Sequence, residues 1–351
     1  MTVAFPSLSC FEGLHIRIAI VGCGAMVEQR YTPTLKRLKW KPTALFDTSA
    51  ERRRSVAKLL GIRPLEAERP SEALDSFDAA IVAAPHAMHE PLCVELLRAG
   101  KHVLVEKPMA LNAASCAAMN RAASQGNGRI AVALQRRQAL GTRWLKEAIA
   151  AAAFGRLCRF TIREGFEYSW PLTTDTMWRK KLAGGGVLVD TGAHTMDQII
   201  CWFGVPSTVE YFDDVDAEDG VEVNCLVRMR WLSGLEGEVE LTRGRLLSNQ
   251  LKLYTEKGEL SLSMSGNFLQ GSPGMLVYRS THIGAPPFKV ISWADLMLVQ
   301  LVQFRAYASG ESANVVTGDA AAQSVELIER CYAKRQRLEK PWIHYTCRQH
   351  A

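Results

Sequence analysis

The feature that most constrains the fold is an alternation of short apolar runs with amphipathic segments between residues 15 and 134. The strand-like runs lie at 16–21, 43–46, 79–83, 103–105 and 130–134, and the helix-like segments between them lie at 31–39, 50–60, 90–99 and 113–124. Gly61 and Gly100 stand where two of these helices should end. Strands and helices that alternate in this way are typical of a parallel sheet with crossover helices.

The pattern changes after a further helix-like segment at 142–152. Strand-like runs then lie at 157–164, 224–231, 236–242, 250–255 and 259–263, and no long helix separates the later ones. Such a succession predicts a largely antiparallel sheet that is open on one face unless something covers it. Two helix-like segments, 293–308 and 319–335, follow.

Composition excludes several classes of protein. The 351 residues are 48% apolar and 22% charged, as in ordinary globular proteins. The formal charge of +6 is modest and scattered, and no recognition helix, zinc spacing or RNA module accompanies it, so we expect no nucleic-acid partner. The nine cysteines include no CxxC pair, residues 1–13 lack the pattern of a signal peptide, and no run is long enough to cross a membrane. We therefore expect a cytoplasmic protein without membrane contacts.

The first strand-like run is followed directly by a glycine-containing turn that reads GCGAMV and then by a helix. Gly22 suits a sharp turn, and Gly24 allows the backbone to approach a pyrophosphate closely. The N–H groups of Ala25 and Met26 at the start of the helix can bind the phosphates. Val27 stands where this fingerprint prefers Gly or Ala, which relaxes the closest packing of helix on strand. The position of the motif after the first strand of a βαβ series indicates a dinucleotide site.

The second strand-like run ends at Asp47. A carboxylate at this strand end can accept hydrogen bonds from the ribose hydroxyls and repels a 2′-phosphate, which favours NAD over NADP. Arg52 and the two arginines after it could soften that repulsion, so NADP stays open. Asp47 could alternatively be an acid that begins the next helix. We expect an α/β protein with a Rossmann dinucleotide-binding domain at 14–136 and an α/β domain with a large, mostly antiparallel open sheet at 137–351.

Three further clusters carry candidate site residues. The first follows the strand at 79–83 and contains Ala84, Pro85, His86 and His89; the second is Glu106-Lys107-Pro108; the third runs from Gly184 through Asp190 to His194. Ligands of open α/β sheets bind beyond the carboxyl ends of the strands, so the first two clusters, together with Gln135 after the last strand, are expected to contact the cofactor.

These motifs resemble the Gfo/Idh/MocA family, the glucose–fructose oxidoreductase, inositol dehydrogenase and rhizopine-catabolism proteins, over about residues 16–332. The resemblance rests on the GxG turn, the Glu-Lys-Pro motif, the stretch AGGGxLxDxGxH at 183–194, and Trp178-Arg179 shortly before it. It implies a Rossmann domain and an α/β domain whose open sheet commonly forms subunit contacts. It also implies that Lys107, Asp190 and His194 line the catalytic site. Two positions depart from the family pattern: Val27, and His86, where the family often has a smaller polar residue.

The three residues suit the oxidation of an alcohol. A base must take the hydroxyl proton while hydride leaves carbon, and the ordinary pKa of a histidine such as His194 lies near neutrality. Asp190 lies four residues earlier, so on a helix it could orient the imidazole or hold a substrate hydroxyl. Lys107 could stabilise negative charge on the reacting oxygen or relay the proton.

Each of these residues also has a structural interpretation. Lys107 could be a solvated lysine paired with Glu106, Asp190 could be an acid at a helix start, and His194 could bond to Asp197. The order of the motifs favours the catalytic interpretation.

Further substrate contacts are expected from Arg136, Tyr168, Trp178 and Arg179, which could form a stacking wall and donors for a polyol together with Trp170. The aromatic residues could equally be core or interface packing. His86 and His89 have no third candidate ligand, so we predict no metal, and we expect His89 to begin the following helix.

The sequence thus predicts an NAD(P)-dependent oxidoreductase that transfers a hydride between nicotinamide and a hydroxyl or keto carbon of a sugar, cyclitol or sugar derivative. Two alternatives stay open: a non-catalytic regulator that senses NAD(P) or a ligand on the same fold, and a glycosidase that uses bound NAD for transient oxidation. We expect a homodimer or homotetramer assembled through the second sheet.

Overall fold

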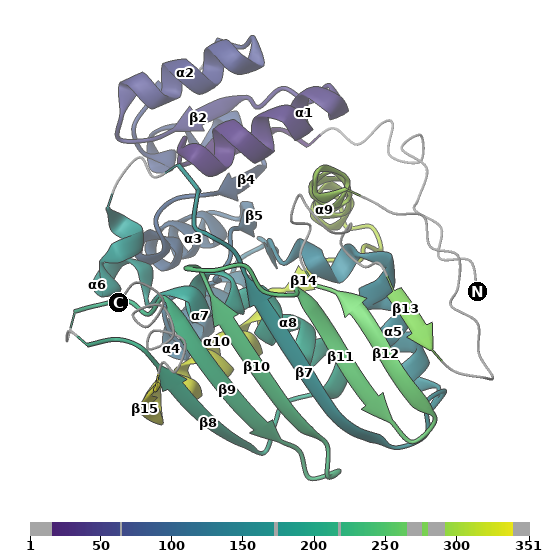
Figure 1. Cartoon of the computed structure of the whole chain (residues 1–351). Coiled ribbons are helices and arrows are strands. Elements are labelled where there is room, and N and C mark those ends of the chain that lie inside the picture. Colours follow the sequence, from purple (N-terminus) through teal and green to yellow (C-terminus); the bar gives the residue numbers. More distant parts are fainter. Residues whose placement is uncertain are drawn as a thin grey trace.

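The computed structural model describes residues 16–63, 65–171, 175–216, 219–264, 276–279 and 292–339. Two sheets, each covered by helices, make up the architecture (Figure 1). The first sheet has the strand order β14-β6-β5-β4-β1-β2-β3. Its strands are β1 (Ile18–Val21), β2 (Ala44–Phe46), β3 (Glu66–Ala67), β4 (Ala79–Val82), β5 (His102–Val105), β6 (Ile130–Val132) and β14 (Val316–Thr317). All neighbours are parallel except β14, which pairs antiparallel with β6.

Helices cover both faces of the first sheet because its central strands are apolar on both sides. Ile18 and Ile20 of β1 pack in one core with α1, α2 and α9, while Ala19 and Val21 pack in a second core with α3, α4 and α10. The helices concerned are α1 (Thr32–Leu38), α2 (Ala50–Leu60), α3 (His89–Arg98), α4 (Ala113–Gln125), α9 (Trp293–Ala308) and α10 (Gly318–Ala333). This doubly covered parallel sheet is the Rossmann arrangement that the alternation predicts.

The second sheet has the order β13-β12-β11-β7-β10-β9-β8-β15. Its strands are β7 (Leu157–Gly165), β8 (Thr208–Asp213), β9 (Asn224–Arg230), β10 (Glu236–Thr242), β11 (Gln250–Thr255), β12 (Gly258–Ser263), β13 (Leu276–Arg279) and β15 (Arg335–Arg337). Its neighbours are antiparallel except in the pairs β7–β10 and β8–β15. The expectation of a mostly antiparallel sheet is confirmed.

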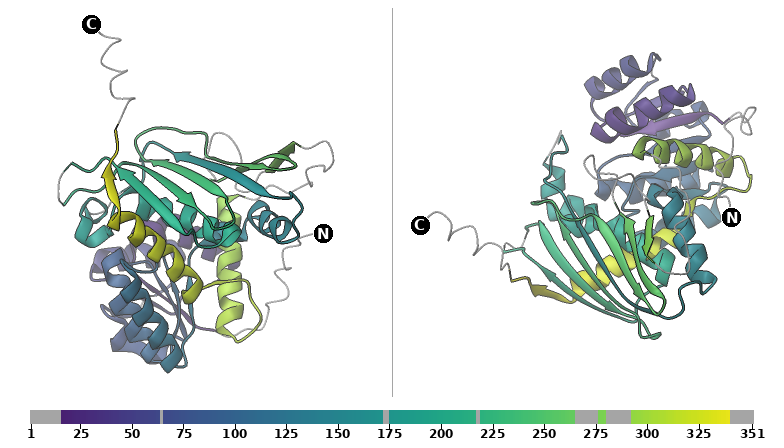
Figure 2. Two further views of the ribbon diagram at one scale, coloured as in Figure 1. Left: turned by 90° about the horizontal axis from the view of Figure 1, so that it is seen from below. Right: turned by 45° about the vertical axis from the view of Figure 1, so that its right-hand side comes forward.

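One face of the second sheet is buried under helices. They are α5 (Leu140–Ala150), α7 (Val187–Asp190), α8 (Gly192–Phe203) and α10, whereas the short helix α6 (Lys180–Ala183) lies against residues 86–88 of the first half. Of these, α8 and α10 lie between the two sheets, and α10 contributes to the cores of both (Figure 2). The opposite face carries charged side chains and has no helix against it in the described part of the chain (Figure 1).

The expected strands and helices of the first half are all present, with ends that differ by a few residues. The first helix begins earlier than expected, because a helical segment from residue 25 passes through a wider turn at Val27–Tyr31 before α1. Gly61 and Gly100 both have positive φ at helix ends, as expected. The sequence analysis did not identify β3, β8, β13, β14 or β15.

Two elements late in the chain, α9 and β14, lie with the first sheet. After the second sheet, α9 packs on the same core as β1, and β14 extends the first sheet beside β6. The expected boundary between the two domains, at residues 136 and 137, stays a prediction. Elements after this boundary also belong to the first sheet. No helix among the described residues is long and apolar enough to cross a membrane. The cysteines within those residues are free thiols.

Candidate active site

The first glycine of the GxG turn is fixed by its backbone conformation and by close packing. Gly22 has a φ of +90°, and its N–H donates to Phe46 O at 2.7 Å. A Cβ atom at this position would lie 2.5 Å from Ala83 O. Any side chain here would collide with the strand end that carries the first histidine cluster, so glycine is required.

The second glycine faces open space. Among the described residues, apart from Gly24 and its chain neighbours, no atom lies within 4 Å of the position that a Cβ of Gly24 would occupy. The helix begins at the next residue, and the first N–H groups of a helix have no partner inside it. Val27 is fully buried in the core on this face of the sheet. A turn with open space and helix N–H groups fits the pyrophosphate of a dinucleotide.

Asp47 holds the turn together. Its carboxylate accepts hydrogen bonds from the N–H of Cys23 and the N–H of Ser49, both at 2.8 Å, and Arg53 donates to its main-chain oxygen. Arg52 lies in the first turn of α2 and its N–H donates to Ser49 Oγ at 3.3 Å. Asp47 thus lies at the strand end beside the GxG turn, where a ribose-binding carboxylate is expected, and its ribose contact stays a prediction.

The two histidines of the first cluster contact main-chain oxygens. His89 begins α3, as expected, and its Nδ1 and Nε2 lie 2.9 Å from Pro108 O and 3.0 Å from Ala84 O. His86 Nδ1 lies 2.8 Å from Ala183 O, at the end of α6. Burial, and then the neighbouring His89, lower the pKa of His86 to about 3. His86 therefore links the first sheet to the glycine run as a neutral imidazole.

Glu106 is not the partner of the Lys107 ammonium. Tyr31 donates its hydroxyl to Glu106 Oε1 at 2.7 Å, and the N–H of Lys107 donates to Oε2 at 3.2 Å. Burial raises the pKa of Glu106, and these two hydrogen bonds and the charge of Lys107 oppose that rise. The alternative in which Glu106 holds the ammonium is not what the structure shows, and Glu106 instead fixes the strand end on which Lys107 stands.

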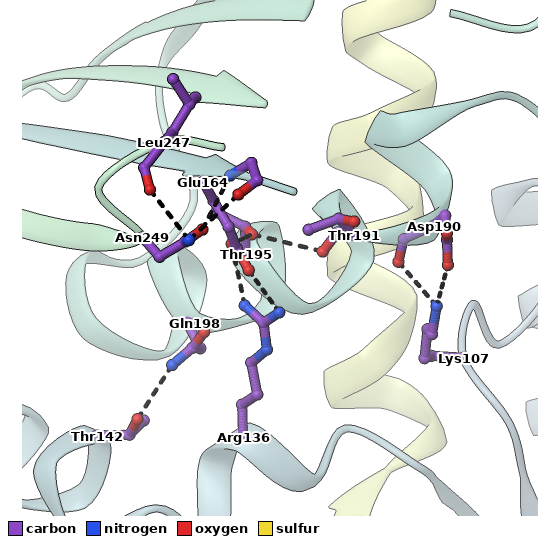
Figure 3. Close-up of polar contacts among 11 residues, drawn as sticks. Lys107, Arg136, Thr142, Glu164, Asp190, Thr191, Thr195, Gln198, Leu247 and Asn249 are labelled. Atoms are coloured by element: carbon purple, nitrogen blue, oxygen red, sulfur yellow. Dashed lines mark hydrogen bonds and ion pairs between the residues drawn. The ribbon is translucent and has the colours of Figure 1, made fainter. Parts of the chain in front are cut away.

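The ammonium of Lys107 reaches across to Asp190 (Figure 3). Lys107 Nζ donates to Asp190 Oδ1 at 2.6 Å and to the main-chain oxygen of the same residue at 2.9 Å. Burial alone would raise the pKa of Asp190, but the charge and the hydrogen bond of Lys107 hold it below its ordinary value. A lysine ammonium has three N–H donors, so one remains for another oxygen.

The glycine run before Asp190 is packed against a buried carboxylate. Glu222 accepts hydrogen bonds from the N–H groups of Gly186 and Leu188, both at 2.9 Å, and from the Tyr332 hydroxyl at 2.7 Å. A Cβ at Gly186 would lie 2.0 Å from the main-chain oxygen of Glu222. The run is thus fixed in one conformation, which holds α7 and its last residue, Asp190, in place.

His194 lies in α8 and is 5% exposed. Burial, and then the charges of Arg136 and Lys107, lower its pKa well below the ordinary value, so the imidazole is neutral. Its Nδ1 is buried without a hydrogen-bond partner among the described residues. The sequence analysis allowed Asp190 to orient this ring, but the Asp190 carboxylate bonds to Lys107 instead. The alternative bond to Asp197 is also not formed, because Asp197 pairs with Arg137.

Arg136 belongs to a second buried ion pair (Figure 3). Its Nη1 and Nη2 donate to the Glu164 carboxylate at 3.0 and 2.6 Å, and the Thr195 hydroxyl donates to the same carboxylate at 2.8 Å. Two of its three guanidinium nitrogens are thus bonded within the chain. Gln135 is buried beside it with an unpartnered Oε1 within the described part of the chain. Contacts of either residue with a ligand stay a prediction.

The aromatic candidates lie together. The rings of Tyr168 and Trp178 meet edge to face with centroids 5.6 Å apart, and Trp178 is 41% exposed. Burial raises the pKa of Tyr168 to about 12, so its hydroxyl stays protonated. Arg179 forms an exposed ion pair with Asp175 at 2.5 Å. Trp170 lies apart from this pair, below the guanidinium of Arg30.

Sequence reasoning missed three charged residues of this region: Glu164, Glu222 and Arg243. In β7 and β10 every second residue faces inward, and these inward-facing positions are mostly apolar. Glu164 and Arg243 continue the two inward-facing series at the strand ends, so a charged residue in such a series could have identified them. Glu222 precedes β9 in a loop and carries no such signal. No group of three potential metal ligands occurs among the residues with defined positions.

Both halves of the chain match models of one family. Residues 16–134 match the oxidoreductase family with the NAD-binding Rossmann fold, and residues 142–261 match the GFO/IDH/MocA C-terminal domain. The chain belongs to the Gfo/Idh/MocA family. It is therefore an NAD(P)-dependent dehydrogenase, and the Rossmann domain of this family binds NAD.

Individual relatives are distant. The chain is 34% identical to dTDP-3,4-didehydro-2,6-dideoxy-alpha-D-glucose 3-reductase of Streptomyces violaceoruber, but over only 29% of this chain and 30% of that protein. It is 26% identical to scyllo-inositol 2-dehydrogenase (NADP(+)) of Bacillus subtilis over 76% of this chain and 77% of that one. The WlbA dehydrogenase of Bordetella pertussis, solved with NADH and UDP-GlcNAcA, superposes with a TM-score of 0.78 at 20% identity over 91% and 95% of the chains. This last likeness shows a shared fold.

Proposed function

We propose that this Gfo/Idh/MocA protein transfers a hydride between NAD and a carbon that carries a hydroxyl or keto group, on a sugar, a cyclitol or a related polyhydroxylated molecule. The observation that carries the proposal is the Lys107–Asp190 pair at 2.6 Å. The pair joins Lys107, which follows β5 of the first sheet, to Asp190, which follows the glycine run of the second half. It leaves one ammonium N–H of Lys107 for a substrate oxygen.

The residues divide the work of alcohol oxidation between them. NAD, when bound, accepts the hydride from the substrate carbon. The free N–H of Lys107 hydrogen-bonds the reacting oxygen and stabilises negative charge on it as the proton leaves. The neutral imidazole of His194 has a lone pair that accepts this proton, directly or through Lys107. Asp190 orients the ammonium through the hydrogen bond from Lys107 Nζ to its Oδ1 at 2.6 Å.

The preference for NAD over NADP rests on Asp47. A 2′-phosphate next to the Asp47 carboxylate would be repelled, while ribose hydroxyls could donate to it. One of the relatives is named for NADP(+), so both cofactors belong in the first assay. That assay is a screen of sugars, inositols and nucleotide sugars, monitored by the absorbance of the reduced nicotinamide.

The screen also separates the alternatives. Net reduction of added NAD by a polyol supports the dehydrogenase. Cleavage of a glycoside without net reduction would identify the glycosidase alternative. Binding of NADH and of a sugar without any turnover would support a regulator.

We propose that subunits associate through the open face of the second sheet. Ion pairs such as Arg163–Glu238 and Arg228–Glu238 lie along this face, so charged rows of opposite sign are available for a second copy. A homodimer or homotetramer is expected, and light scattering after size-exclusion chromatography would measure it. Free thiols among the described residues are consistent with the expected reducing, cytoplasmic location.

A further inference from the structure

Arg243 is a buried arginine that forms no ion pair with a carboxylate of the described residues. It follows β10 and continues the alternation of Val239 and Leu241, so its side chain points to the helix-covered face of the sheet. Its N–H donates to Val223 O and its main-chain oxygen accepts from the N–H of Tyr168, both at 3.0 Å. The residue is 2% exposed. Main-chain hydrogen bonds to the segments on both sides therefore fix the backbone from which the side chain extends.

Aromatic rings cover the guanidinium. Its central carbon lies 4.8 Å from the centroid of the Trp178 ring and 5.5 Å from that of the Tyr168 ring. Rings satisfy the faces of a guanidinium but not its N–H groups, which point outward in the plane. All three nitrogens of Arg243 lack a hydrogen-bond partner within the described ranges.

Two other arginines near the site, unlike Arg243, are each paired with a carboxylate. Arg136 is bonded to Glu164 and Arg137 to Asp197, each by two hydrogen bonds to one carboxylate. An unpaired buried charge is costly, and proteins normally pair it. The absence of an acceptor at Arg243 therefore points to an acceptor that arrives with a ligand.

The guanidinium lies within electrostatic reach of the proposed catalytic pair. The charge of Arg243 contributes to the lowered pKa of Asp190. Asp190 and Lys107 neutralise each other, and the nearby Arg136 is neutralised by Glu164. Of the three cationic side chains named here, Arg243 alone has no carboxylate partner among the described residues.

We propose that Arg243 binds a carboxylate of the substrate, so that the substrate is a sugar acid or another polyhydroxylated acid. The planar N–H groups match a carboxylate in a bidentate pair, and a single unpaired guanidinium matches a monoanion better than a phosphate dianion. The Tyr168 and Trp178 rings hold the guanidinium in its plane for this contact. The proposal rests on the proposed dehydrogenase function, whose site it extends.

The test compares each acid with its neutral counterpart. Wild-type protein is assayed with D-glucuronate, D-glucose and D-glucuronamide, with the galacto series, and with UDP-glucuronate and UDP-glucose, in the presence of NAD. Glucose 6-phosphate tests a phosphate in place of the carboxylate. For at least one series we expect kcat/KM for the acid to exceed that for the neutral forms by about 10- to 100-fold, as for a charge-assisted hydrogen bond.

Arg243→Gln should abolish that acid preference by raising KM for the acid much more than KM for the neutral sugar. Arg243→Lys keeps the charge without the planar donors and should give an intermediate ratio. Arg98→Gln, on the exposed side of α3, is the matched control and should leave the ratio unchanged. If Arg243→Gln does not fold, the ratio in the wild-type protein and in Arg243→Lys still decides.

Each outcome has a separate meaning. If no acid in the panel is preferred to its neutral form, or if the ratio survives in Arg243→Gln, the carboxylate subsite is wrong. A preference for glucose 6-phosphate over glucuronate would overturn it in favour of a phosphate. If one of these outcomes occurs but neutral sugars still reduce NAD, only the carboxylate subsite is wrong and the dehydrogenase function stands. The dehydrogenase proposal fails only if no polyol, charged or neutral, reduces NAD.

Discussion

Two glycine-rich turns flank the candidate active site, and they differ in what lies beside the glycines. In the first turn, the position of a Cβ at Gly24 has no atom of the described chain within 4 Å, apart from its chain neighbours. In the second turn, a Cβ at Gly185 would lie 1.9 Å from the Tyr332 hydroxyl oxygen, and one at Gly186 would lie 2.0 Å from Glu222 O. In the first turn, glycine leaves space in which a ligand can bind. In the second turn, it allows other parts of the chain to pack closely against the backbone.

The difference matches the two tasks of the site. In the proposed function, the first turn presents helix N–H groups to a dinucleotide, so its space must stay open. The second turn places Asp190 at hydrogen-bonding distance from Lys107, so its backbone must have one conformation. A motif of two or three glycines can therefore mean a ligand site or a packing site, and neighbouring atoms decide which.

The largest effect is expected where the second turn meets the chemistry. Lys107→Met removes the ammonium that Asp190 orients, and we expect kcat to fall by about 10³-fold, within the range for general acid–base and electrostatic catalysis. NADH binding, measured by fluorescence titration, should stay close to that of the parent because the first turn is untouched. The control is Lys58→Met, an exposed lysine of α2. Unchanged turnover in Lys107→Met would contradict the idea that the second turn is rigid in order to place Asp190 beside a catalytic lysine.

A pair of matched substitutions tests the two turns directly. Gly186→Ala places a methyl group against the Glu222 backbone, and overpacking of this kind lowers the free energy of unfolding by about 1–3 kcal/mol. Gly24→Ala meets no atom of the chain, so its melting temperature should match the parent while its affinity for NADH falls. Thermal unfolding and NADH titration of both variants measure the contrast. Equal melting temperatures, or a Gly24→Ala variant that binds NADH normally, would contradict it.

Some of this arrangement could be predicted from the sequence and some could not. The parallel sheet follows from apolar periodicity, and the importance of Lys107, Asp190 and His194 follows from motifs. Pairing is different, because it depends on which segments meet in space. The motifs allowed Asp190 to orient His194 or to hold a substrate hydroxyl, but its carboxylate pairs with Lys107, which comes from a distant segment of the chain.

Short strands and buried polar partners were also beyond sequence patterns. β3 and β14 have two residues each, too few for an alternation to appear. Arg136 was expected to face a ligand, and sequence spacing gave no reason to expect its contact with Glu164, 28 residues later. Such contacts are set by how the two halves of the chain pack together.

The first turn also has a charge test. Asp47→Ala removes the repulsion toward a 2′-phosphate, so we expect the ratio of NADP to NAD affinity to rise about tenfold, which is about 1.4 kcal/mol. The substitution also removes the acceptor of the Cys23 and Ser49 N–H groups, which could loosen the turn. Loosening would weaken both cofactors, whereas loss of repulsion weakens NAD and improves NADP. Titration with both cofactors separates the two effects, and an unchanged ratio would show that Asp47 does not read the ribose.

The smallest effect concerns the link between the turns. His86 contacts the main-chain oxygen of Ala183, beside the second turn, and folding lowers its pKa to about 3 from an ordinary value near 6.5. Below pH 6.5 the unfolded chain therefore binds a proton that the folded chain does not, so folding stability is lost as pH falls from 6.5 toward the folded pKa. His86→Asn lacks this titration.

Because His86 is partly exposed, we expect its contribution to stay below about 1.4 kcal/mol per pH unit, the limit for one group. Denaturant unfolding of parent and His86→Asn at pH 7.0, 6.0 and 5.0 measures the difference in slope, which cancels the titration of all other groups. The parent should lose stability more steeply than the variant. Parallel slopes would mean that the imidazole is solvated in the folded state and does not hold the second turn to the first sheet.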